Sequence, residues 1–220
     1  MVWTADRSVQ YPYDPAAAIR HFRSVDKALY DLTREIGAYR LELRSDMTPF
    51  SALLRSIVYQ QLSGHAAKAI LDRVLALYDS RFPQPKQLIN TTFDQLRACG
   101  LSQSKIRAVW DLAQKEEAGL LPTPADVQDM TDSELIDAYT TVRGIGPWTV
   151  QMLLIFNLGR SDVLPDNDLG VRRGFKVAFS LDDMPSPEQL RLHGERWNPY
   201  RSVASWYLWR AADTKFRSKD

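Results

Sequence analysis

The chain has 220 residues, of which 45% are hydrophobic and 25% charged, and its formal net charge is +1. This composition is typical of a soluble globular protein, and no apolar run is long enough for a membrane span. The single cysteine, Cys99, excludes an internal disulfide and any cysteine-ligated zinc or iron–sulfur centre within the chain. Because the N-terminal residues also lack the pattern of a secretory signal, we expect a cytoplasmic protein.

Apolar residues recur at helical spacing along almost the whole chain, and most of these segments open with a capping residue, often followed by proline. In chain order, the predicted helices begin after Asp14, Asp26, Thr48, Ser63, Thr92, Ser102 or Ser104, Thr131, Gly146, near Asp168, and after Ser186 and Pro199. Residues 39–44 alternate like a strand, but one strand cannot form a sheet. The sequence therefore predicts an all-α fold.

The predicted helices are distributed over two lobes. We expect a central lobe of residues 48–155 and a second lobe in which residues 1–47 pack with residues 156–220. No low-complexity linker separates these regions, and no internal repeat is evident.

The stretch VRGIGPWTV joins two predicted helices, and the whole motif spans residues 131–158. Gly144 and Gly146 can adopt positive φ and leave the backbone bare, while Pro147 suits the first helical position, where an amide would be unpaired. Ile145 is expected to pack between the two helices. A helix start with bare amides binds an anion, most naturally a phosphate. A plain helical hairpin would also carry two glycines, but the longer pattern resembles the helix–hairpin–helix that holds a DNA backbone phosphate.

An acidic loop follows the second helix of the hairpin. It contains Asp166, Asn167 and Asp168 just before the next predicted helix. Each of these residues is a common N-cap, and Asp166 or Asn167 could cap that helix as well as Asp168. Taken alone, an ordinary N-cap is the favoured interpretation of these acids, although capping does not require Asp168 in particular.

Three stretches make the resemblance more specific. Residues 56–70 (SIVYQQLSGHAAKAI), 144–152 (GIGPWTVQM) and 195–209 (ERWNPYRSVASWYLW) are similar to the helix–hairpin–helix DNA glycosylases of the AlkA type, the 3-methyladenine DNA glycosylases II. The resemblance covers roughly residues 48–210. It implies a two-lobed fold with the active-site cleft between the lobes. The β-rich N-terminal lobe of AlkA is expected to be reduced or missing here.

Breaking an N-glycosidic bond requires a carboxylate that stabilises positive charge on the sugar, and a base that is flipped out of the helix. The resemblance assigns the carboxylate to Asp168, which can also orient or deprotonate water, with Asp166 as the alternative. Relatives that cut the DNA backbone carry a Schiff-base lysine where this chain has Trp148. We therefore expect a monofunctional glycosylase that leaves an abasic site.

The remaining site residues are expected in two groups. A base pocket would stack an electron-poor alkylated purine on aromatic rings, and its predicted residues are Trp148, Trp209, Met152, Leu169, Tyr59, His21 and Phe22. The predicted DNA-binding residues are Arg143, Gly144, Ile145, Gly146, Thr149, Gln61, Leu62, Ser63 and Arg173. AlkA inserts an apolar residue into DNA where this chain has Gln61, so either Gln61 or Leu62 is the expected wedge.

The predicted partner is double-stranded DNA containing 3-methyladenine or 7-methylguanine, bound by a monomer that does not interact with membranes. No cofactor or metal is expected, although the resemblance implies that a monovalent cation can bind at the hairpin. Two alternatives remain open. One is a glycosylase for oxidised or mismatched bases, and the other is a non-catalytic helix–hairpin–helix module that binds DNA.

Overall fold

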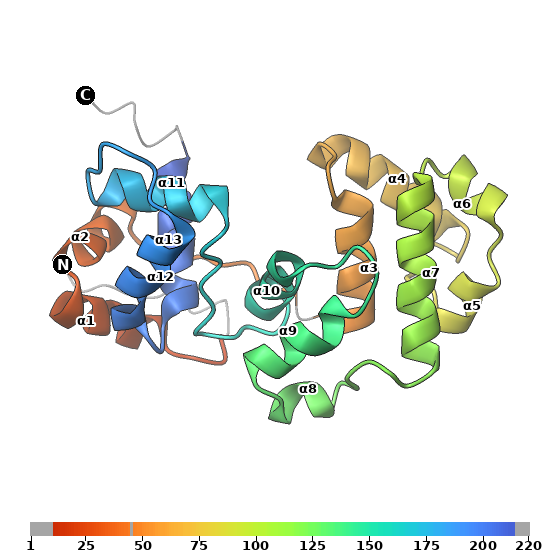
Figure 1. The fold of residues 1–220 in the computed structure, drawn as a ribbon, viewed down its shortest axis with the longest axis horizontal. Coiled ribbons are helices and arrows are strands. Elements are labelled where there is room, and N and C mark those ends of the chain that lie inside the picture. Colours follow the sequence, from red (N-terminus) through yellow and green to blue (C-terminus); the bar gives the residue numbers. More distant parts are fainter. Residues whose placement is uncertain (1–10, 45, 214–220) are drawn as a thin grey trace. The chain divides into compact units, whose positions relative to one another are not determined.

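The computed structural model describes residues 11–44 and 46–213, and this part of the chain contains helices and loops but no β-strand (Figure 1). The prediction of an all-α fold is thus confirmed, and residues 39–44 are extended without joining a sheet. The elements are α1 (Pro15–Val25), α2 (Lys27–Ile36), α3 (Pro49–Tyr59), α4 (Gly64–Ala76), α5 (Pro85–Ile89), α6 (Phe93–Ala98), α7 (Gln103–Glu117), α8 (Asp126–Asp129), α9 (Asp132–Thr140), α10 (Pro147–Phe156), α11 (Leu169–Ala178), α12 (Pro187–Gly194), the 3-10 helix η1 (Glu195–Trp197) and α13 (Arg201–Ala212).

The capping residues explain most of the helix starts. Side-chain oxygens accept a hydrogen bond from an amide in the first turn at Asp14, Asp26, Thr48, Ser63, Thr92, Ser102, Thr131 and Ser186. Ser102, not Ser104, therefore caps α7. The sequence analysis missed α5 and α8, which have five and four residues and are too short to show a helical period.

The chain divides into two compact units. The terminal unit comprises the described residues up to Arg44 and those from Leu154 onward, and the central unit comprises those between. The division lies within α10, so the central unit holds the hairpin and the start of α10, whereas the acidic loop and α11 belong to the terminal unit.

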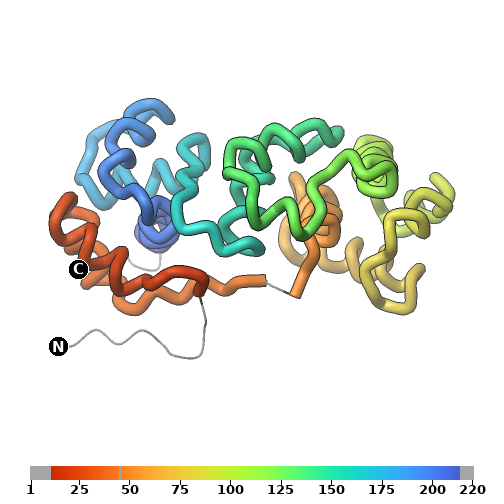
Figure 2. Tube along the Cα trace, turned by 90° about the horizontal axis from the view of Figure 1, so that it is seen from below, coloured from red at the N-terminus to blue at the C-terminus, as the bar shows by residue number. Residues whose placement is uncertain are grey.

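The terminal unit is built around α13, which packs against α11 and α2. Its core contains Leu29, Val171 and Tyr207, all of them completely buried. Residues 11–14 lie beside the extended segment after α2 (Figure 2), where the Tyr11 hydroxyl donates to the Leu41 carbonyl at 3.0 Å. The start of α11 and the end of α13 therefore belong to the same unit.

The central unit is built around α7, the longest helix, which packs against both α3 and α5. Leu54 and Ile57 of α3 and Ile106 and Leu112 of α7 are completely buried. No helix in the described part of the chain is long and apolar enough to cross a lipid bilayer.

Candidate active site

Asp168 is the N-cap of α11. Its Oδ1 accepts a hydrogen bond from the Val171 amide at 2.8 Å. The expectation that Asp166 or Asn167 would cap this helix equally well is therefore wrong. The Asp168 amide donates to the Pro165 carbonyl. This turn places Asp168, and not Asp166, at the start of the helix.

Trp209 of α13 binds the same carboxylate oxygen. Its Nε1–H donates to Asp168 Oδ1 at 2.8 Å, and its ring lies against Phe156, with centroids 5.6 Å apart. Two donors from different helices thus hold one oxygen of the carboxylate and fix its orientation. The structure brings together these two residues, which lie 41 positions apart in the sequence.

Two glycines of α11 permit this contact. A Cβ added at Gly170 would lie 2.9 Å from Cδ1 of Trp209 and 3.0 Å from Oδ1 of Asp168. A Cβ at Gly174 would lie only 1.8 Å from the Leu208 carbonyl oxygen, so α11 and α13 touch backbone to backbone there. The sequence analysis missed both glycines. Their spacing of four, which places them on one helix face, was the available signal.

The other predicted residues of α11 face solvent. Leu169 is 65% exposed, next to Asp168. Arg173 is also exposed, whereas its basic neighbours hold the following loop: Arg172 Nε donates to the Pro185 carbonyl and Lys176 Nζ to the Asp182 carbonyl. Of these three basic residues, Arg173 therefore has the side chain that is best placed to contact a polyanion such as DNA.

His21 and Phe22 lie on α1 of the terminal unit. Phe22 is completely buried in the core of this unit, so its side chain is not exposed to line a base pocket as predicted. His21 Nε2 donates to the Arg196 carbonyl at 2.9 Å, and its ring lies 5.7 Å from that of Tyr200. These contacts tie α1 to the segment that precedes α13.

The hairpin of the central unit follows the predicted pattern, with positive φ at only one of its two glycines. Gly144 has a φ of 76°, Ile145 is buried, and Pro147 begins α10. Gly146, by contrast, is not at positive φ, so only Gly144 needs glycine for its backbone angle. A Cβ at Gly146 would still meet nothing within 4 Å, so the space at the Cβ position of this residue is open.

The first two turns of α10 divide their side chains between solvent and core. Trp148 is 47% exposed and Met152 is half-buried, whereas Thr149 is only 5% exposed. The Thr149 amide already donates to the Gly146 carbonyl. A phosphate would therefore meet the amides of Gly144 and Gly146 before it meets Thr149.

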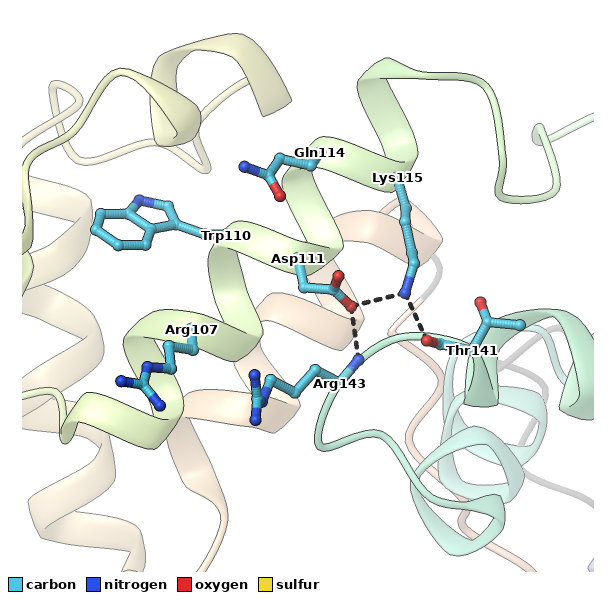
Figure 3. A pocket seen from close by; sticks show the side chains of 7 residues that line it. All are labelled: Arg107, Trp110, Asp111, Gln114, Lys115, Thr141 and Arg143. Atoms are coloured by element: carbon cyan, nitrogen blue, oxygen red, sulfur yellow. Dashed lines mark hydrogen bonds and ion pairs between the residues drawn. The ribbon is translucent and has the colours of Figure 1, made fainter.

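Asp111 of α7 anchors the hairpin turn (Figure 3). Its Oδ2 accepts from the Arg143 amide at 2.7 Å and from Lys115 Nζ at 2.8 Å, and Lys115 also donates to the Thr141 carbonyl. Burial raises the pKa of the Asp111 carboxyl, but these hydrogen bonds outweigh it and the pKa is lowered. The ionised carboxylate thus fixes the turn to α7.

The predicted wedge segment is tied to the same hairpin. Gln60 Nε2 donates to the Gly144 carbonyl at 2.9 Å, and Lys105 Nζ donates to the carbonyls of Val58 and Gln60, each at 2.7 Å. Desolvation lowers the pKa of Lys105. The two ends of the candidate DNA-binding surface are therefore joined by direct contacts, which the sequence analysis did not anticipate.

The wedge candidates protrude from this support. Gln61 has a φ of 57°, an uncommon value for a residue other than glycine, and Leu62 is exposed. Ser63 caps α4 through the Ala66 amide. Tyr59 lies beneath the guanidinium of Arg55, 3.9 Å from its ring centroid, so one ring face already has a cation.

Residues 54–199 match the sequence pattern described as HhH-GPD superfamily base excision DNA repair protein. The chain belongs to the HhH-GPD superfamily. Its relatives in this superfamily include DNA-3-methyladenine glycosylase 1 of Schizosaccharomyces pombe, which is 35% identical over 194 residues, 87% of this chain and 85% of the relative. The resemblance drawn from the hairpin and the stretches around it is thus confirmed.

Solved structures of HhH-GPD proteins share the fold. The Schizosaccharomyces pombe 3-methyladenine DNA glycosylase in complex with abasic DNA matches with a TM-score of 0.80 and 35% identity, over 88% of this chain and 95% of that one. A DNA-3-methyladenine glycosidase from Bacillus halodurans matches with a TM-score of 0.85 and 32% identity, over 96% and 95% of the two chains. Among the described residues, no group of three or more His, Cys, Asp or Glu could hold a metal ion.

Proposed function

We propose that this protein is a monofunctional DNA glycosylase that removes 3-methyladenine and 7-methylguanine from double-stranded DNA and leaves an abasic site. The observation that carries the proposal is the carboxylate of Asp168, oriented by Trp209 in an HhH-GPD chain. Relatives that are named 3-methyladenine glycosylases, and that align over most of the chain, support the choice of substrate.

Asp168 acts on the sugar. When the N-glycosidic bond breaks, positive charge develops on the sugar ring, and a carboxylate nearby stabilises that oxocarbenium-like state. Oδ1 is held by Val171 and Trp209, so the orientation of the carboxylate is set before DNA arrives. The same group orients or deprotonates the attacking water. Asp166, in the same loop, is the alternative.

Aromatic side chains select the base. An alkylated purine carries a positive charge, which the face of an electron-rich ring attracts. Trp148 and Trp209 are the proposed stacking residues, and the half-exposed indole of Trp148 is accessible to a flipped base. The residues proposed to complete the pocket are Met152, Leu169, Tyr59 and His21.

The hairpin positions the DNA without reading its sequence. The amides of Gly144 and Gly146 precede α10 and are proposed to bind a backbone phosphate, together with the exposed side chain of Arg143. A monovalent cation between hairpin carbonyls and that phosphate is part of the proposal. Arg173 is proposed to contact a further phosphate, and Ser63 to contact the DNA beside the wedge.

The wedge is proposed to be Gln61 or Leu62. The left-handed backbone at Gln61 turns the chain so that both residues lie at the exposed tip between α3 and α4. Alanine at the true wedge position should weaken binding to a duplex with an abasic site, because it would leave the gap in the base stack unfilled. Comparison of Gln61→Ala with Leu62→Ala in the same binding assay assigns the role.

The central experiment measures base release from duplexes that contain 3-methyladenine or 7-methylguanine. Wild-type protein should release the methylated base, and Asp168→Asn should lose at least about a hundredfold in single-turnover rate. Asp166→Asn is the matched control and should remain active. DNA binding without release by the wild type would favour a non-catalytic module, and release of oxidised or mismatched bases instead would favour the other glycosylase class.

A second experiment tests whether the enzyme is monofunctional. Trp148 cannot form a Schiff base, so strand cleavage should appear only after alkali or an abasic-site nuclease is added. Borohydride should trap no covalent complex between protein and DNA. A trapped complex would contradict this part of the proposal even if the base is released.

A further inference from the structure

The hairpin turn borders a depression on the surface of α7. Its volume is about 470 Å³, and its lining residues, shown in Figure 3, are Arg107, Trp110, Asp111, Gln114, Lys115, Thr141 and Arg143. The residues from α7 follow the spacing of one helix face. The depression lies entirely within the central unit, so its shape depends on the contact between α7 and the hairpin alone.

The charge of this depression is positive once internal contacts are taken into account. Asp111 is engaged by the Arg143 amide and by Lys115, and Lys115 also donates to the Thr141 carbonyl. Within residues 11–44 and 46–213, the guanidinium groups of Arg107 and Arg143 have no hydrogen-bond acceptor or carboxylate partner, and both side chains belong to exposed residues. Two unpaired cations therefore remain, one from α7 and one from the hairpin.

We propose that this depression is a second phosphate site for the DNA strand that the hairpin holds, with Arg107 as a DNA-contacting residue beside Arg143. The inference rests on the proposed function, because it assumes that the hairpin binds DNA. Arg143 directly precedes Gly144, so a phosphate bound between the two arginines lies next to the one bound by the hairpin amides. The planar fork of a guanidinium matches the oxygens of a phosphodiester.

The groups that line the site favour a backbone contact over base recognition. The indole N–H of Trp110 already donates to the Thr91 carbonyl, which leaves only its ring to contact a sugar. The Asp111 carboxylate is occupied by the hairpin and is not available to read a base edge. Binding here should therefore depend on salt and not on the damaged base.

The test measures affinity for two duplexes, one undamaged and one with an abasic site, over a range of salt concentrations. Arg107→Ala should weaken binding to both by about two- to fivefold, as expected for one solvent-exposed ion pair. The slope of log affinity against log salt should fall by about 0.9, the value for one phosphate contact. Arg107→Lys should retain the slope, because it retains the charge.

Arg81→Ala is the matched control. Arg81 is an exposed arginine of the same unit that does not line the depression, so its removal should change neither affinity nor slope. Unchanged binding by Arg107→Ala, a defect confined to the abasic duplex, or an equal loss of slope in Arg107→Lys would each overturn the phosphate site. The binding assay measures no base release, so it tests the phosphate site alone. The release assay described above tests the proposed glycosylase activity separately.

Discussion

At the residue scale, Asp168 combines two tasks that sequence reasoning treated as alternatives. The carboxylate caps α11 through the Val171 amide and accepts the indole N–H of Trp209 on the same oxygen. Capping is an ordinary role for aspartate, but a tryptophan donor from another helix is not needed for a cap. Asp26, the N-cap of α2, also accepts an indole N–H, from Trp197, but on the oxygen that does not cap the helix, whereas at Asp168 one oxygen makes both contacts.

We predict that replacing Trp209, which donates this hydrogen bond, slows the release of the base. Trp209→Phe retains an aromatic ring against Phe156 but removes the hydrogen bond to Asp168. Single-turnover release of 7-methylguanine should slow by about tenfold or more, because the carboxylate is less well oriented. Trp206→Phe on the same helix is the control: its buried ring packs against Tyr39, so it should cost stability and leave the rate intact. Equal rates in both variants would rule out the orienting role.

At the element scale, the close packing of α11 on α13 makes the candidate site possible. Gly174→Ala places a Cβ 1.8 Å from the Leu208 carbonyl oxygen, a backbone atom that cannot rotate away. The free energy of unfolding should fall by about 3 kcal/mol or more, measured by chemical denaturation. Gly64→Ala is the control, because a Cβ there meets nothing within 4 Å and alanine favours the helix. A tolerated Gly174→Ala would show that the two helices can separate.

A buried carboxylate joins α2 to α12 and η1 in the same unit. Asp26 Oδ2 accepts from His193 Nε2 and from Trp197 Nε1, each at 2.8 Å, while Oδ1 caps α2. Burial raises the pKa of Asp26, but the hydrogen bonds from His193, Trp197 and Leu29 outweigh it and the pKa is lowered. The stabilisation from this carboxylate is therefore complete above the unfolded-state pKa of about 3.9 and is lost as pH falls through the lower folded-state pKa.

Asp26→Asn should reveal this dependence. At neutral pH, the variant should be less stable than the wild type by about 2 kcal/mol, because charged hydrogen bonds are replaced by neutral ones. Below about pH 4, the two melting curves should converge as the wild-type carboxyl is protonated. Asp31→Asn on the exposed face of α2 should leave stability nearly unchanged at every pH. A constant difference between Asp26→Asn and wild type down to pH 2 would contradict this assignment.

At the scale of the whole molecule, the chain contains two units that share one helix and carry different parts of the proposed machinery. The hairpin and wedge lie in the central unit, whereas Asp168 and Trp209 lie in the terminal unit. Both units are built from short, well-capped helices around a central helix, α7 in one and α13 in the other. The proposed reaction therefore needs one complete chain, and a single copy supplies every proposed residue.

The mass of the free protein and its stoichiometry on DNA test whether one copy of the chain is sufficient. Sedimentation of the free protein should give a mass near 25.2 kDa, and titration with a duplex that contains one abasic site should saturate at one protein per duplex. A stable dimer that alone binds DNA would show that residues from a second copy are needed. Because this measurement requires no catalysis, its result is independent of the base that the enzyme removes.

Local patterns in the sequence were enough to predict the helices, the hairpin and the loop that carries Asp168. Caps, prolines and apolar spacing act over one or two turns, so they can be read without knowing what packs where. The exceptions were α5 and α8, which are too short to have a period, and Gly146, whose φ depends on the closed turn. The N-cap of α11 could not be assigned to one residue from the sequence, because three consecutive residues, Asp166, Asn167 and Asp168, all favour the N-cap position.

The contacts that turn those elements into a site were decided only by the tertiary structure. Trp209 reaches Asp168, Asp111 holds the Arg143 amide, and Gln60 binds the Gly144 carbonyl, across 41, 32 and 84 positions of sequence. The contact between Trp209 and Asp168 depends on the close approach of α11 and α13, which Gly170 and Gly174 permit because they have no Cβ. The sequence alone determined the family, the fold class and the candidate carboxylate, because these rest on local pattern. The orientation of the carboxylate and the anchoring of the hairpin follow from packing between segments that are distant in the chain.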